Sequence, residues 1–186
     1  DIDAILRCVT DRTRVVMFAN PDNPTGSYIS GQEVQQLREG LPKHVLLVVD
    51  SAYAEYAEAP DYELATTLVE KHDNVVMTRT FSKIFGMAGL RVGWLYGSPD
   101  VVDVINRIGI SFPISGPALA AATAALDDKA HVKHVFEHNL AWRQWFCAEV
   151  LRLGLHPYPS ETNFVLVRFD DPAKPAIEAD AHLRRR

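Results

Sequence analysis

An uninterrupted apolar run, Val45–Val49, constrains the possible fold of this chain most strongly. The run is rich in valine and leucine and ends in Asp50. Strands of this kind are buried on both faces, as in parallel sheets that helices cover on each side. The short runs Val15–Phe18 and Val75–Met77 have the same character. These runs predict an α/β fold built on a mostly parallel sheet that helices flank.

Helical patterns separate the three apolar runs. Residues 30–39 are expected to form a helix, because Ser30 as N-cap and Glu33 three residues later make a capping box. Residues 64–69 favour a short amphipathic helix before the third run. The order strand, helix, strand, helix, strand predicts that the three strands end at one edge of the sheet. Open α/β sheets bind their ligands at that edge.

The third run leads into TRTFSKIFGMAGLRVG, residues 78–93. Lys83 follows the hydroxyl residues Thr80 and Ser82, and Arg91 lies eight positions beyond the lysine. A partly buried lysine at a strand end can act as an amine nucleophile. Hydroxyls and a guanidinium suit a phosphate group. The pattern therefore indicates a ligand that carries both an aldehyde and a phosphate. A lysine without these neighbours would be interpreted as a solvated loop residue.

This segment resembles the lysine signature of the fold-type I aminotransferases, which use pyridoxal 5'-phosphate (PLP). A second motif agrees with it. The loop NPDNPTG, residues 20–26, is similar to the family loop whose second asparagine, here Asn23, donates a hydrogen bond to the phenolic oxygen of the cofactor. Its prolines and glycine alone would predict only a rigid turn.

A third motif, DSAY at residues 50–53, resembles the family motif that faces the cofactor ring. The resemblance implies that Asp50 lies against the pyridine nitrogen and Tyr53 against the phenolic oxygen. The family's usual glutamate is replaced by Ser51. On its own, Asp50 could equally be a helix cap. Three motifs in family order are far more specific than any one of them.

The resemblance implies a role for each residue of these motifs. Lys83 would form a Schiff base with PLP and later move a proton, and Asp50 would keep the ring nitrogen protonated. Thr80, Ser82 and Arg91 would anchor the phosphate. The catalytic set is then Lys83, Asp50 and Tyr53. The set that binds the cofactor also includes Asn23 and the three phosphate anchors.

Within the family, the motifs and a late TNF at residues 162–164 most resemble the histidinol-phosphate aminotransferases of histidine biosynthesis. The implied reaction is transamination between an amino acid or amino phosphate and a 2-oxo acid. Three alternatives stay open: an aromatic or other amino acid aminotransferase, a threonine-phosphate decarboxylase, and a non-enzymatic effector domain of a regulator. Asn163 is a candidate substrate contact, although a polar strand residue is usually structural.

The remaining sequence predicts mainly helices. We expect helices at 100–107 and 118–126, a long helix that ends near Leu153, a strand at 162–168 and a helix at 177–186. Residues 1–128 would form part of the large PLP-binding domain. Residues 129–186 would form the linking helix and the start of a small α+β domain. Family members are longer, so we expect a partial chain, with the arginine that binds the substrate carboxylate outside it.

Composition excludes several classes of partner. The net charge of -5 and the scattered basic residues give no stripe for nucleic acid or anionic lipid. Cys8 and Cys147 are far apart, which favours reduced thiols in a cytoplasmic protein. His131, His134 and His138 could share a helical face, but a solvated face is favoured over a metal site. We expect small-molecule substrates, a homodimer, and no metal or membrane partner.

Overall fold

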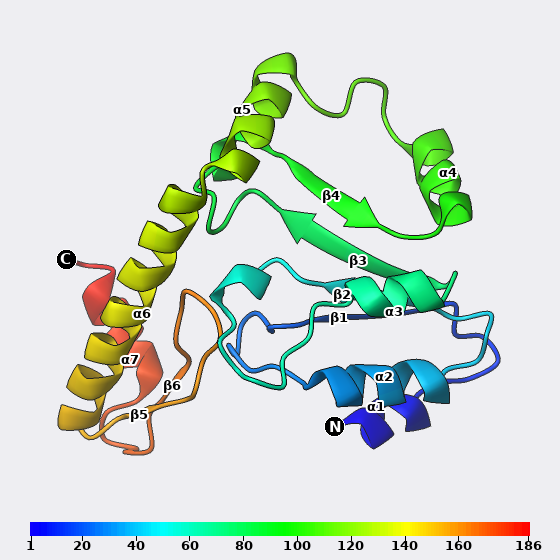
Figure 1. Ribbon diagram of the computed structural model, residues 1–186. Coiled ribbons are helices and arrows are strands. Elements are labelled where there is room, and N and C mark those ends of the chain that lie inside the picture. Colours follow the sequence, from blue (N-terminus) through cyan, green and yellow to red (C-terminus); the bar gives the residue numbers. More distant parts are fainter.

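The structure is a computed structural model that describes all residues from Asp1 to Arg186 (Figure 1). Two single-turn 3-10 helices, Ala54–Tyr56 and Ala88–Leu90, lie in its loops. The other elements are, in chain order, α1 (Ile2–Arg7), β1 (Val15–Ala19), α2 (Gly31–Gly40), β2 (Leu46–Asp50), α3 (Thr66–Lys71), β3 (Val75–Thr80), β4 (Gly93–Tyr96), α4 (Pro99–Ile108), α5 (Gly116–Asp127), α6 (Lys129–Arg152), β5 (His156–Pro157), β6 (Val167–Arg168) and α7 (Ala176–Leu183).

The main sheet has the strand order β1-β2-β3-β4. The first three strands are parallel, and β4 runs antiparallel to β3. Ala19 pairs with Asp50, and Asp50 pairs with Thr78. The carboxyl ends of β1, β2 and β3 therefore lie together at one edge of the sheet. The predicted α/β architecture with a mostly parallel sheet is confirmed.

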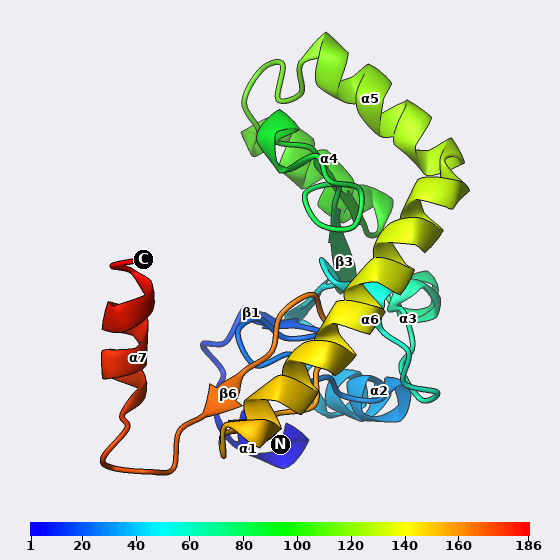
Figure 2. The same cartoon turned by 90° about the vertical axis from the view of Figure 1, so that its left-hand side faces the viewer.

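Helices α1, α2 and α3 lie on one side of this sheet (Figure 2). Alternate residues of β2 and β3 point toward them, and Leu47, Val49, Val75 and Met77 are buried in one cluster with Leu37 of α2. Each such side chain contributes about 1.5–3 kcal/mol when it leaves water. This layer fixes the strands, and so fixes where the loops at their carboxyl ends begin.

The long helix α6 runs beside the loop edge of the main sheet and leads into the antiparallel pair β5 and β6 (Figure 1). Its N-cap is Asp128, whose side chain accepts a hydrogen bond from the backbone N of His131 at 2.9 Å. We propose that residues 1–128 belong to one domain and 129–186 to a linking helix and a second domain. The change from the four-stranded to the two-stranded sheet at α6 supports this division.

Two predicted elements differ from the structure. The predicted strand at 162–168 is wrong for most of its length, because only Val167–Arg168 pair as a strand. The hydroxyls of Ser160 and Thr162 bond instead to the backbone of Phe164 and form a turn. The last predicted helix begins at Ala176 and ends at Leu183 rather than continuing to residue 186.

The predicted capping box at α2 is confirmed, and it yields a test of local stability. The Ser30 Oγ accepts a hydrogen bond from the Glu33 backbone N at 3.3 Å, and the Glu33 carboxylate accepts from the Ser30 backbone N at 2.8 Å. The backbone N and then the hydroxyl of Ser30 lower the pKa of Glu33. Ser30→Ala should reduce the free energy of unfolding by about 1 kcal/mol at neutral pH, measured by urea denaturation.

The pH dependence of that loss follows from the lowered pKa of Glu33. A carboxyl with a lowered pKa in the folded state stabilises the fold above its unfolded pKa, and this stabilisation disappears as the pH falls through the folded value. The difference between Ser30→Ala and the unmodified protein should therefore shrink below about pH 4. Gln36→Ala, at an exposed position of the same helix, is the control and should change little. A loss equal in both variants would contradict the capping role.

Candidate active site

The loop after β1 is held in place by Asn20, which is 1% exposed. Its backbone N donates to the carbonyl of Asp50 at 2.9 Å. Its side chain accepts from the backbone N of Ile29 at 2.9 Å and donates to the Ile29 carbonyl at 3.0 Å. The Tyr62 hydroxyl donates to the Asn20 carbonyl at 3.1 Å, and burial raises the pKa of Tyr62 to about 12, which keeps it a donor. These bonds close residues 20–29 into a fixed loop.

Three of the predicted residues lie together around the ring of Tyr53. They are Asn23, Tyr53 itself and Lys83, one from the loop after each parallel strand. The side-chain amide of Asn23 donates to the Tyr53 hydroxyl at 3.3 Å. The Nζ of Lys83 lies 5.0 Å from the centroid of the Tyr53 ring. Tyr53 itself is buried, with 4% of its surface exposed. The loops after β1, β2 and β3 thus deliver an amide, a phenol and an amine to one place.

Asp50 ends β2 next to this group and is partly buried. Its Oδ1 accepts a hydrogen bond from the backbone N of Ala52 at 3.1 Å, so the carboxylate also caps the local turn. No protein group donates to its other oxygen, which leaves that oxygen free for a ligand. Ser51, where the family usually has glutamate, is buried, and its hydroxyl has no hydrogen-bond partner.

The predicted phosphate anchors lie on β3 and in the loop that leads to β4. The Oγ1 of Thr80 accepts from the backbone N of Ser82 at 3.1 Å, so these two residues form a tight turn before Lys83. Thr80 pairs with Gly93, and Arg91 therefore lies just ahead of the neighbouring strand. Arg91 is exposed in a left-handed conformation, and its Nη1 donates to the Ala88 carbonyl at 2.8 Å. No hydrogen bond joins Arg91 to either hydroxyl.

The cavity that Asn163 lines includes none of Asn23, Tyr53 and Lys83. Asn163 is exposed and lines this cavity of about 320 Å³ between α6 and residues 163–165, together with Trp142 and Phe146 of the helix. No hydrogen bond fixes its side chain. Its role as a substrate contact stays a prediction.

Sequence analysis missed the residue that packs on the tyrosine. The ring of Phe164 meets the Tyr53 ring edge-on, with centroids 5.3 Å apart. Ile84 and residues of α6, including Val135 and Phe136, complete the same apolar cluster. Only the resemblance at residues 162–164 marked this segment. Nothing in the local sequence pairs Phe164 with a ring more than a hundred positions earlier.

The three histidines of α6 do not form a metal centre. The rings of His134 and His138 lie 6.4 Å apart between centroids on an exposed face of the helix. No group of three or more histidine, cysteine, aspartate or glutamate side chains could hold a metal ion. None of the helices combines the length and apolar character that a membrane crossing requires.

Comparisons with known proteins agree with the three motifs. The family model described as aminotransferase class I and II matches residues 1–185. The chain belongs to this family. The histidinol-phosphate aminotransferase of Nitrobacter winogradskyi is 50% identical over 100% of this chain and 51% of the relative. That of Maricaulis maris is 48% identical over 98% of this chain and 51% of the relative.

A solved structure shows the same arrangement of elements. The histidinol-phosphate aminotransferase of Sinorhizobium meliloti, solved in complex with pyridoxal-5'-phosphate, superimposes with a TM-score of 0.88 at 36% identity. The match covers 100% of this chain and 50% of the solved one. This aminotransferase-family chain spans about half the length of the curated relatives it matches. Its fold is the corresponding part of the fold-type I transferases.

Asn20 offers a test of how the aminotransferase loop is held. Asn20→Ala would leave the backbone N and carbonyl of Ile29 without their partners, at a cost of about 2–3 kcal/mol in the free energy of unfolding. Urea denaturation measures this loss. Asn106→Ala, at an exposed position of α4, is the matched control and should lose less than about 0.5 kcal/mol. Equal losses in the two variants would show that Asn20 does not hold the loop.

Proposed function

We propose that the protein to which this chain belongs is a PLP-dependent aminotransferase that acts on histidinol phosphate and a 2-oxo acid. The observation that carries the proposal is the meeting of Asn23, Tyr53 and Lys83 at one sheet edge. Relatives that are 50% identical and bear the name histidinol-phosphate aminotransferase support the choice of substrate. The family match supports the reaction type.

The residues present fit PLP in chemical type. The amine of Lys83 suits an aldehyde, and the Tyr53 hydroxyl and Asn23 amide offer hydrogen-bond donors for a phenolic oxygen. Asp50 has a carboxylate oxygen without a protein donor, which suits a protonated ring nitrogen. The hydroxyls of Thr80 and Ser82 and the guanidinium of Arg91 suit a phosphate. Each chemical group of the cofactor thus has a counterpart at this edge of the sheet.

When bound, PLP supplies an aldehyde for an amine and a ring that takes up the electron pair released at the substrate carbon. The remaining tasks fall to the chain. Lys83 would hold the cofactor through its aldehyde, with loss of water, and as a free amine it would carry the proton as general base and then acid. Asp50 would hold a proton on the ring nitrogen, and Asn23 and Tyr53 would hold the phenolic oxygen. The rigid strand ends keep these groups in register.

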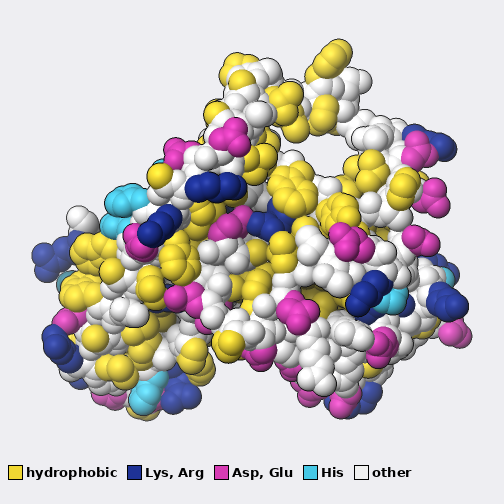
Figure 3. All heavy atoms as spheres, viewed as in Figure 1, with side chains coloured by type: hydrophobic (Ala, Val, Ile, Leu, Met, Phe, Trp, Pro, Cys, Tyr) yellow, Lys and Arg dark blue, Asp and Glu magenta, His cyan; other side chains and the backbone are white.

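We propose a homodimer as the working form. Large apolar side chains crowd the top of the molecule, over α5 and the segment that joins it to α4 (Figure 3). Ile108, Ile110 and Phe112 are 75%, 77% and 94% exposed. An apolar surface of this kind supports burial against another copy.

Cys8 and Cys147 are free thiols, which supports a cytoplasmic location.

Borohydride labelling tests the lysine assignment. The protein, expressed from its complete reading frame and loaded with PLP, should be yellow, and borohydride should attach the cofactor to Lys83. Lys83→Ala should abolish the labelled peptide, as read by mass spectrometry, because Lys83 supplies the amine at the Tyr53 ring. Lys43→Ala, at an exposed lysine, should leave labelling unchanged. A labelled peptide that persists in Lys83→Ala would overturn the assignment.

A substrate screen tests the amino donor. The loaded protein should convert histidinol phosphate in a half-reaction at least about tenfold faster than phenylalanine or threonine phosphate, a difference of about 1.4 kcal/mol in the barrier. The change in cofactor absorbance on mixing measures the rate. Release of carbon dioxide from threonine phosphate would identify the decarboxylase alternative. An equal response to all three compounds would refute the substrate assignment but not the cofactor assignment.

A further inference from the structure

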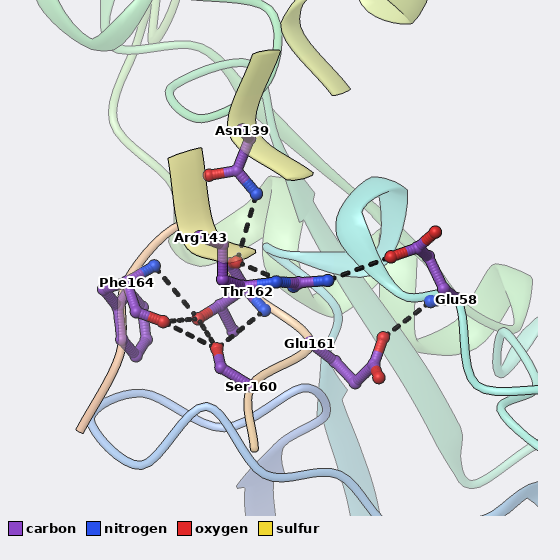
Figure 4. Close-up of polar contacts among 7 residues, drawn as sticks. All are labelled: Glu58, Asn139, Arg143, Ser160, Glu161, Thr162 and Phe164. Carbon is purple, nitrogen blue, oxygen red and sulfur yellow. Dashed lines mark hydrogen bonds and ion pairs between the residues drawn. The ribbon is translucent and has the colours of Figure 1, made fainter. Parts of the chain in front are cut away.

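A polar cluster that sequence analysis did not identify joins α6 to the candidate active site (Figure 4). At its centre, the Nη1 of Arg143 donates to the carbonyl of Thr162 at 3.1 Å, and its Nη2 donates to the carboxylate of Glu58 at 2.9 Å. The Arg143 side chain is 13% exposed. Asn139, one helical turn earlier on α6, donates to the same Thr162 carbonyl at 3.3 Å.

The segment held by Arg143, residues 160–164, has a fixed internal structure. The hydroxyls of Ser160 and Thr162 both donate to the carbonyl of Phe164, at 2.6 and 3.1 Å. The backbone N of Phe164 donates back to the Thr162 hydroxyl at 3.3 Å. Thr162 is fully buried. The position of Thr162 therefore fixes the backbone from which the Phe164 ring extends.

Two further contacts tie this segment to the loops at the sheet edge. The backbone N of Glu161 donates to the carbonyl of Gly26 at 2.8 Å, and the Glu161 carboxylate accepts from the backbone N of Glu58 at 2.6 Å. A Cβ on Gly26 would lie 2.5 Å from the Ser160 Oγ, so only glycine allows this approach. Glu58 is thus bonded twice, through its backbone N to Glu161 and through its carboxylate to the positive charge of Arg143.

The ring of Phe164 carries this arrangement into the site. It packs edge-on against Tyr53, whose hydroxyl accepts from Asn23 and whose ring lies under the Nζ of Lys83. We infer that Arg143 is a positioning residue: by holding residues 160–164, it keeps Phe164 against Tyr53 and the Tyr53 hydroxyl beside Asn23. This inference rests on the proposed function, because the Tyr53 hydroxyl matters only if it faces the cofactor oxygen.

Arginine suits this task better than lysine does. The two acceptors, a backbone carbonyl and a carboxylate, receive bonds from the two terminal nitrogens of one planar fork. A lysine ammonium is a single point and would satisfy one acceptor at the expense of the other. The fork thus fixes the distance between α6, Glu58 and Thr162.

The decisive variant is Arg143→Met, which keeps the apolar stem and removes both bonds. In the protein expressed from its complete reading frame, backbone amides of residues 160–164 should exchange hydrogen about tenfold faster or more. The affinity of the unloaded protein for PLP, measured by fluorescence titration, should fall about three- to tenfold, the range expected for one aromatic pair. Arg152→Met is the matched control, since Arg152 is an exposed arginine of the same helix paired with Glu149.

A spectroscopic readout separates positioning from simple destabilisation. Donors at the cofactor oxygen would stabilise its negative charge, so the absorbance of the bound cofactor would change at a lower pH than without them. In Arg143→Met the Tyr53 hydroxyl should be held less firmly beside Asn23. The midpoint pH of the cofactor absorbance change should therefore rise by about half to one pH unit. Phe164→Leu should raise the midpoint similarly, and the double variant should shift no further than either single one.

The outcomes are distinguishable. The inference would be overturned if Arg143→Met had the same midpoint pH and the same exchange rates as Arg152→Met. It would also be overturned if the shifts in midpoint pH from Arg143→Met and Phe164→Leu added together in the double variant. If Arg143→Met fails to fold, Arg143→Lys is used in its place. Its midpoint pH should also rise, but by a smaller amount. An unmodified protein that fails to bind PLP through Lys83 would overturn the proposed function instead. In that case the faster exchange of residues 160–164 in Arg143→Met would still report on the Arg143 contacts.

Discussion

The parallel pairing of β1, β2 and β3 is the constraint on which the rest of the site depends. Because the strands run in one direction and Asp50 stands beside both Ala19 and Thr78, three loops begin at one edge. Each loop then needs only a short path to bring its functional side chain to the others. A shift of a strand by one residue would turn its side chains to the opposite face and would bury Asp50 differently.

The ring of Tyr53 is the point where the two parts of the chain meet. Asn23 and Lys83 reach it from the loops of the main sheet, and Phe164 reaches it from the segment that follows α6. Val135 and Phe136 of α6 extend the same apolar cluster. An aromatic side chain serves this position well, because its ring can be buried while its hydroxyl stays available for hydrogen bonds. Packing and chemistry are therefore coupled through one residue.

Much of the fold could be predicted from the sequence, because each signal was local. Val45–Val49 has the composition of a buried strand, and Ser30 with Glu33 forms the capping box that starts α2. The site residues on the strand ends were predicted from motifs that are themselves local. The turn at residues 160–164 was not, because the apolar run 164–167 favours a strand while the hydroxyls of Ser160 and Thr162 compete for the backbone. The partners that decide this contest, Arg143 and Glu58, lie far away in sequence.

The turn at residues 160–164 shows why this segment is not a strand. A strand would direct the hydroxyl of Thr162 and the ring of Phe164 to the same face and would commit their backbone groups to a ladder. In the turn, the hydroxyls satisfy the Phe164 carbonyl, so the Thr162 carbonyl stays free to accept from α6. The segment can therefore be fixed by the helix on one side and present an aromatic ring on the other. The long helix is therefore connected to the amine of Lys83 through direct contacts. Arg143 bonds to Thr162, Phe164 packs on Tyr53, and the Nζ of Lys83 lies over the Tyr53 ring.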